Sequence, residues 1–177
     1  MNKRTSATIV FVILCAACVA HALYYYPLLP EKVATHFGPS GRPDAWGGKM
    51  QFFIVYLVTV GVMAAIFLGL GLFLTKFPDD AFTLPNKDYW LAPERRRETL
   101  AYIFSCSLWL GSLTIVLLFD LAHQSFQVHL GKATRLDHFW ISMGIYLTIV
   151  TMWCIATYRK VNKKGASPTC HDTRRHS

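Results

Sequence analysis

Residues 7–26 read ATIVFVILCAACVAHALYYY and contain no Asp, Glu, Lys or Arg. A bilayer core about 30 Å thick requires roughly 20 apolar residues of helix, and a helix satisfies its own backbone in lipid. Three further stretches of similar length, 52–75, 100–119 and 139–158, also lack these charged types. All 8 prolines lie outside the four stretches. The sequence therefore predicts an all-α integral membrane protein, with four transmembrane helices in a single domain over residues 1–177.

The composition supports a membrane class. Of the 177 residues, 53% are hydrophobic and 16% charged, whereas about a quarter of a soluble domain is charged. This excludes a disordered chain and disfavours an ordinary soluble enzyme. The formal charge of +8 would favour a nucleic-acid partner if the charges were spread over a soluble surface. The position of these charges along the chain argues against a nucleic-acid partner.

Most of the 18 Lys and Arg residues fall in the N-terminal tail, the loop 76–99 and the tail 159–177. The loops 27–51 and 120–138 hold few. The positive-inside rule therefore predicts cytoplasmic termini in a bacterial inner membrane, with loops 27–51 and 120–138 outside. We expect the basic tail to contact anionic lipid, and we expect no nucleic-acid partner.

Small residues recur at four-residue spacing in two of the predicted spans. They are Gly61, Ala65 and Gly69 in the second span, and Ser107 and Gly111 in the third. Small side chains let helix backbones approach closely in lipid. We prefer internal packing of a four-helix bundle, because four helices must pack somewhere, and a homodimer seam stays open. We also expect the first helix to remain uncleaved, because His21 and the tyrosines flank its Ala20-His21-Ala22 site.

The first outer loop carries the most specific motif. It is rich in Pro and Gly, which predicts tight turns instead of a long helix. The motif residues are Leu29, Pro30, Val33, Thr35, His36, Phe37, Gly41, Asp44, Trp46 and Lys49.

This pattern resembles the bacterial membrane family called domain of unknown function 1648. The family carries Leu-Pro-x-x-Val-x-x-His-Phe/Trp and then Gly-x-x-Asp-x-Trp/Tyr-Gly-x-Lys between two membrane helices. Residues 84–99 resemble the segment after its second helix, so the resemblance covers roughly residues 7–105. The family includes SdpI-like immunity proteins, which protect a cell from a secreted killing peptide. The resemblance thus implies an immunity-like role by analogy.

We assign a candidate ligand surface to this loop, formed by His36, Asp44, Trp46 and Lys49. They offer a titratable ring, a carboxylate, an aromatic face and a cation, and loops carry function disproportionately. The structural alternative, which we prefer, is that these residues stabilise turns and anchor the loop in the interface.

A metal site is a weaker hypothesis. Imidazole is a common zinc ligand, but no ligand-spacing motif is present. We therefore predict no metal and no cofactor. The weak candidates are the histidines of the outer side, namely His21, His36, His123, His129 and His138.

The second loop offers a candidate docking surface for a protein or peptide partner. Pro93 suits the first turn of a helix, so residues 93–99 predict an extension of the third span. The alternative, again preferred, is a charged and aromatic membrane anchor. The candidate docking residues are Asn86, Tyr89, Trp90, Glu94, Arg95 and Arg96.

The sequence contains no nucleophile–base motif and no charged residue at the centre of a span, which counts against catalysis and ion-coupled transport. We expect a non-catalytic polytopic membrane protein that acts in envelope sensing or toxin immunity through the outer loop. The alternatives are a membrane enzyme or metal-handling protein that uses the outer histidines, or an accessory subunit of a membrane complex. The sequence leaves oligomerisation open.

Overall fold

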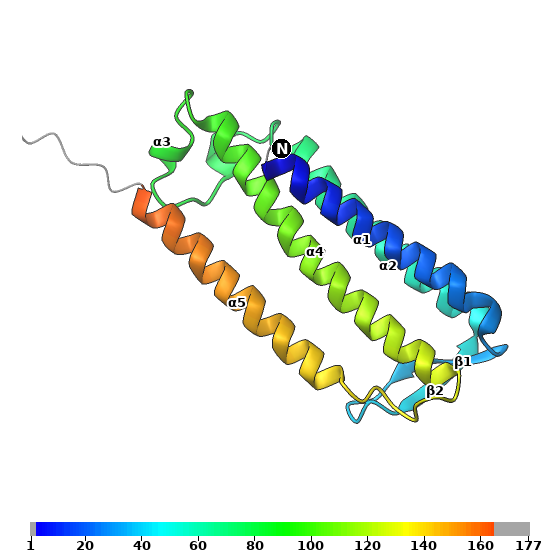
Figure 1. Cartoon of the computed structure of the whole chain (residues 1–177). Helices are drawn as coiled ribbons and strands as arrows, with labels where there is room; N and C mark the ends of the chain where they lie inside the picture. The colour runs from blue at the N-terminus through cyan, green and yellow to red at the C-terminus, as the bar shows by residue number, and fades with distance from the viewer. Residues whose placement is uncertain (1–2, 165–177) are drawn as a thin grey trace, which may run out of the picture.

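The computed structural model describes residues 3–164 and contains four long helices (Figure 1). They are α1 (Lys3–Tyr25), α2 (Lys49–Phe73), α4 (Arg96–His129) and α5 (Phe139–Lys164). Each is long and apolar enough to cross a membrane. The prediction of four such helices is confirmed. The basic tail 159–177, where anionic lipid was expected, lies outside the described residues from residue 165 onward.

The all-α prediction is wrong for the segment between α1 and α2, which contains two β-strands. After a short 3-10 helix, η1 (Tyr26–Leu28), the chain forms an antiparallel hairpin of β1 (Lys32–Phe37) and β2 (Pro43–Gly48). Gly41 adopts a φ of 75° in the turn, and its N–H donates to the Gly38 carbonyl at 2.8 Å. The turn that the Gly and Pro residues predict is therefore present, and strand pairing on either side of it adds a small sheet.

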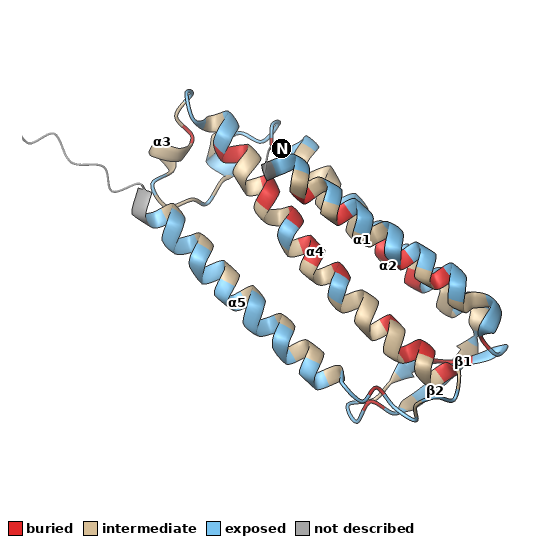
Figure 2. Cartoon of the chain, viewed as in Figure 1, coloured by how far each residue is buried: buried red, intermediate tan, exposed pale blue. Residues whose placement is uncertain are grey.

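The core lies where α1, α2 and α4 meet. Phe11 of α1 and Leu108 and Ile115 of α4 are completely buried. Among the four long helices, α5 packs mainly beside α4, and its apolar side chains stay largely exposed (Figure 2). The expected four-helix bundle is therefore a three-helix core with a fourth helix on its side.

The small residues divide between the core and the surface. A Cβ atom on Gly111 would lie 2.8–2.9 Å from ring atoms of Phe67 and Phe11, so this glycine permits close packing of three helices. In contrast, Gly61 has no neighbour within 4 Å of such an atom, and Ala65 is exposed. The preferred prediction of internal packing is right for Gly111 and wrong for Gly61 and Ala65, because these two residues of α2 lie on its exposed side.

Helix α4 is longer than the predicted span. Its 34 residues extend about 51 Å and include the first half of the expected outer loop 120–138. Gly131 ends the helix with a φ of 69°, while the N–H groups of Gly131 and Lys132 donate to the carbonyls of Val128 and Gln127. This is a Schellman cap. At its other end the helix begins at Arg96, after a turn, and not at Pro93 as expected.

The two ends of the molecule differ in construction (Figure 1). The hairpin end holds β1, β2 and the loop 130–138. The terminal end holds the start of α1, the end of α5, and the segment from α2 to α4 with η2 (Asp79–Ala81) and α3 (Lys87–Trp90).

Candidate functional site

The hairpin is fixed to α4 by a buried histidine. Val33 and Ala34 of β1 are 0% exposed, and the Nε2 of His129 lies 3.0 Å from the Ala34 carbonyl oxygen. Because a carbonyl only accepts, the imidazole donates at this nitrogen. The rings of Phe37 and Phe52 pack around His129. The base of the hairpin is thus held by packing and by a hydrogen bond away from water.

The hairpin tip is held separately. The Leu136 N–H donates to the Gly41 carbonyl at 2.9 Å, and the Trp140 indole N–H donates to the Pro39 carbonyl at 2.9 Å. The tip therefore contacts the loop after α4 and the start of α5. Residues far apart in the chain clamp it at two points.

His36 and Asp44 face each other on the outside of the clamped hairpin. Asp44 is an extra residue in the strand register, since His36 lies opposite Ala45 and Phe37 lies opposite Pro43. This bulge brings the Asp44 carboxylate to 2.5 Å from Nδ1 of His36. The side chains are 69% and 50% exposed. The structure brings these two predicted residues together at the surface.

Trp46 and Lys49 do not join that pair in one pocket. Trp46 is 54% exposed on β2. The ammonium of Lys49 lies 2.8 Å from the Glu31 carboxylate and 5.5 Å from the centre of the Tyr26 ring. Lys49 therefore closes the base of the hairpin, and His36, Asp44 and Trp46 are the three candidate residues whose side chains stay largely exposed. We call these three residues the hairpin surface.

Residues 13–60 match the family model of DUF1648, a domain of unknown function. The match covers 48 of the 177 residues, and we call residues 13–60 the DUF1648 segment. The match spans the second half of α1, the hairpin and the first half of α2, and it confirms the expected resemblance over these residues. The expected continuation to residue 105, with residues 84–99, lies outside the match. No curated protein and no solved structure matches the chain, so the matches give no support to a link with SdpI-like immunity proteins.

The DUF1648 segment contributes one histidine to a contact with α4. Nε2 of His21 lies 3.1 Å from Nδ1 of His123, and Nε2 of His123 lies 3.1 Å from the Gln127 amide nitrogen. Tyr25 and Phe126 surround the pair. Spacing along the chain could not reveal this contact, because 102 positions separate the two histidines.

The five candidate metal ligands do not converge. His21 and His123 meet, but His129 binds the hairpin backbone and His36 pairs with Asp44. The backbone N–H of His138 donates to Gln124. Within residues 3–164, no three His, Cys, Asp or Glu side chains lie close enough to hold a metal ion.

A polar network joins α5 to α4. The Asp120 carboxylate accepts hydrogen bonds from the Gln124 amide and the Ser142 hydroxyl, both at 2.7 Å. Gln124 and Ser142 are not among the site residues predicted from the sequence. The four-residue spacing of Asp120 and Gln124 places them on one helix face, but only the structure adds Ser142.

The predicted docking residues at the terminal end mostly make internal contacts. The Trp90 indole N–H donates to the Val161 carbonyl at 3.0 Å, and the Asn86 amide donates to the Asn162 carbonyl at 3.3 Å. These two bonds tie α5, near the end of its described residues, to the segment before α4. The Arg95 guanidinium lies 4.1 Å from the centre of the Tyr89 ring.

The two remaining docking candidates differ from each other. Arg96 donates to the Asp79 carboxylate at 2.8 Å and to the Phe77 carbonyl at 3.0 Å. Glu94 is exposed. Five of the six candidate docking residues therefore contribute contacts that hold the terminal end together.

His129→Phe tests the anchoring of the hairpin. Phenylalanine keeps a ring among Phe37 and Phe52 but leaves the buried Ala34 carbonyl without its donor. We expect a loss of about 1–3 kcal/mol in the free energy of unfolding, together with faster hydrogen exchange at the β1 amides. Thermal unfolding in detergent and hydrogen exchange measure the two effects. His138→Phe, at an exposed position, is the control, and equal behaviour of the two variants would contradict the anchoring role.

Proposed function

We propose that this chain is a non-catalytic multi-pass membrane protein with cytoplasmic termini, and that its hairpin surface recognises a peptide or protein outside the membrane. Recognition of this kind would serve toxin immunity or envelope sensing, which are the biological roles that we propose. One observation supports the proposal above the others. The hairpin is clamped at its base and its tip, yet three residues of its motif, His36, Asp44 and Trp46, are at least half exposed.

The stability of the fold does not account for the hairpin surface. An exposed ion pair contributes about 0–1 kcal/mol, and His36 and Asp44 are at least half exposed. Trp46 is also more than half exposed. Tryptophan is enriched among residues that dominate binding at protein interfaces. A rigid hairpin that presents a charged pair and an indole therefore fits recognition better than packing.

The orientation of the helices can be tested directly. Alkaline phosphatase fused after Lys49 should be active, since the enzyme needs the oxidising outer compartment, and the same enzyme fused after Lys164 should be inactive. The basic residues of the terminal end support this orientation through the positive-inside rule. Activity of the second fusion and not the first would reverse the proposed topology.

Removal of the hairpin surface should abolish the biological role without unfolding the protein. We expect the variant His36→Ala/Asp44→Ala/Trp46→Ala to melt within a few degrees of the native chain, because the removed side chains are largely exposed. In a deletion strain challenged with secreted peptide toxins or envelope stress, it should fail to complement.

The matched control is Arg135→Ala/Asp137→Ala, which removes another exposed ion pair, at 2.9 Å, from the same end of the molecule. This variant should complement fully. Full complementation by both variants would show that the hairpin surface is dispensable.

Metal handling is the second candidate function, and the contact between His21 and His123 is the observation that favours it. Two imidazoles supply fewer ligands than the three or four that zinc sites use. Elemental analysis of the purified protein decides the matter, since stoichiometric metal that is lost in a His21→Ala variant would favour this function over recognition. Co-purification and crosslinking test the accessory-subunit alternative.

A further inference from the structure

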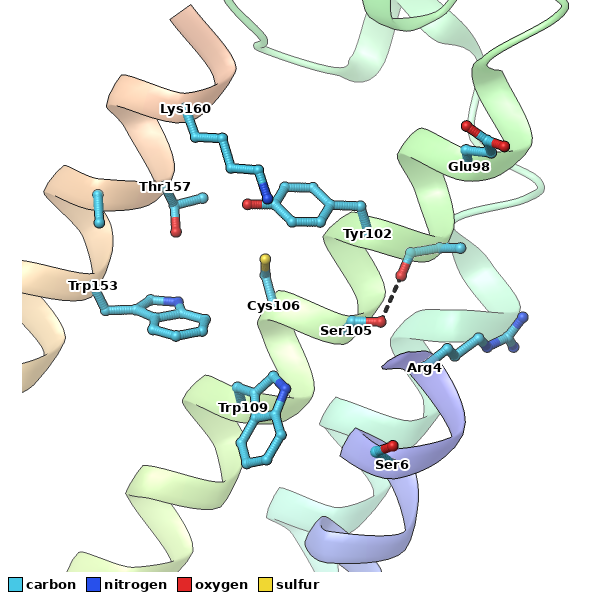
Figure 3. Close-up of a pocket in the computed structure, with 12 residues that line it drawn as sticks. Arg4, Ser6, Glu98, Tyr102, Ser105, Cys106, Trp109, Trp153, Thr157 and Lys160 are labelled. Carbon is cyan, nitrogen blue, oxygen red and sulfur yellow. Dashed lines mark hydrogen bonds between the residues drawn. The ribbon is translucent and has the colours of Figure 1, made fainter. Parts of the chain in front are cut away.

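A cleft runs over α4 between α5 and the start of α1, from the middle of the helices to the terminal end (Figure 3). Thr114 and Tyr146 are hydrogen-bonded at 3.0 Å near the middle, and Trp90 of α3 binds the last turns of α5. Between these two points lies a cleft of about 720 Å³ (Figure 3). A second opening of about 360 Å³ shares Tyr102 and Trp153 with it.

The walls of the cleft change in character along its length. Toward the middle of the helices, the indoles of Trp109 and Trp153 line it from both sides (Figure 3). Toward the terminal end it is lined by Lys160 of α5 and, on the other side of α4, by Arg4 of α1, whose guanidinium extends toward the side away from Lys160 (Figure 3). The part of the cleft near the middle of the helices is therefore apolar, and the part near the terminal end is cationic. An anionic amphiphile has the complementary arrangement, with an apolar chain and a negatively charged head group.

The two cations are not neutralised by the fold. The Lys160 ammonium lies 4.4 Å from the centre of the Tyr102 ring, and the Arg4 guanidinium lies 5.1 Å from that of Phe104. Among the described residues, neither forms an ion pair with a carboxylate. Glu98 also lines the cleft and offsets one charge. An adjoining recess shares Arg4 and adds Arg97, which restores the excess of positive charge.

We propose that this cleft binds one anionic phospholipid. Its head group lies at the end lined by Arg4 and Lys160, and an acyl chain runs along Trp109 and Trp153. Basic pockets between transmembrane helices bind anionic head groups in this way. An apolar helix from a second copy would leave the cations without a counter-charge, whereas a lipid phosphate supplies one. The proposal rests on membrane insertion and is independent of recognition by the hairpin.

Native mass spectrometry of the full chain in detergent tests the site, with phosphatidylglycerol and phosphatidylcholine as added lipids. Phosphatidylglycerol should bind first and more tightly. The variant Arg4→Gln/Lys160→Gln should weaken binding of the first phosphatidylglycerol by about tenfold or more, because each cation near a lipid surface contributes on the order of 1 kcal/mol. Ala156→Phe, at an exposed position that lines the cleft, should weaken binding without a change in charge.

The matched control is Lys76→Gln/Arg159→Gln, which removes two exposed cations of the terminal end that do not line the cleft. Binding close to that of the native chain supports the proposal. An equal loss in both double variants shows a general surface attraction and overturns it. Displacement by inorganic phosphate at similar concentration shows a free-anion site instead. A lipid-free dimer that Ala156→Phe disrupts assigns the cleft to a second copy. None of these outcomes bears on the hairpin variants.

Discussion

Gly111→Leu should reduce the free energy of unfolding by at least about 3 kcal/mol. Even the Cβ atom of the new side chain would lie 2.8 Å from a ring atom of Phe67 and 2.9 Å from one of Phe11. Phe11 is completely buried and cannot move away without disturbing the contact between α1 and α4. Overpacking of this kind typically costs 1–3 kcal/mol and sometimes more, and leucine adds three further carbons beyond Cβ.

The measurement is thermal unfolding in detergent, where this loss corresponds to a fall in melting temperature of roughly 6–12 °C. Gly61→Leu is the matched control, because it makes the same change in an apolar helix where no atom lies within 4 Å of the added Cβ. We expect the control to be neutral or slightly stabilising, since leucine has the higher helix propensity. If both variants melt alike, the packing of three helices around Gly111 is wrong.

Gly41→Ala should destabilise the hairpin by about 2–4 kcal/mol. The backbone φ of 75° costs an L-residue roughly 1–2 kcal/mol. The added Cβ would in addition lie 2.7 Å from the Leu136 carbonyl oxygen, and this neighbour is backbone that cannot rotate out of the way. Relief of the clash would break the hydrogen bond from Leu136 to Gly41 and release the hairpin tip.

Gly131→Ala separates the two causes. Its φ of 69° imposes the same backbone strain, but no atom lies within 4 Å of the added Cβ. The control should therefore lose only about 1 kcal/mol. Hydrogen exchange should report faster opening of the hairpin for Gly41→Ala and not for Gly131→Ala. Equal destabilisation would mean that the loop 130–138 does not press on the tip.

The sequence predicted the parts of the candidate site whose cause is local. The motif identified His36, Asp44 and Trp46, and its glycines and prolines predicted the turn between the strands. The role of Lys49 required the structure, because its partner Glu31 lies across the base of a hairpin that the sequence analysis did not predict. His129 was considered only as a weak metal candidate, since nothing near it in the chain indicates that it holds Ala34.

The small residues of the helices also show what the sequence could not predict. Gly61 and Gly111 look alike in sequence, as each lies in an apolar helix beside other small residues. Gly111 packs against two phenylalanines, whereas Gly61 faces outward. Helical periodicity indicates which residues share a face, but it does not indicate which face meets a neighbour.

The four long helices were determined by the sequence itself, because an unbroken apolar stretch of a given length is a local property that each segment carries alone. The tertiary structure decided which helices form the core and which motif residues are buried or exposed. It also decided that α5 lies outside the core, against α4, with a cationic cleft beside it. These features depend on contacts between residues separated by up to 102 positions. Such contacts are selected by the packing of whole helices, and no single segment contains the information to specify them.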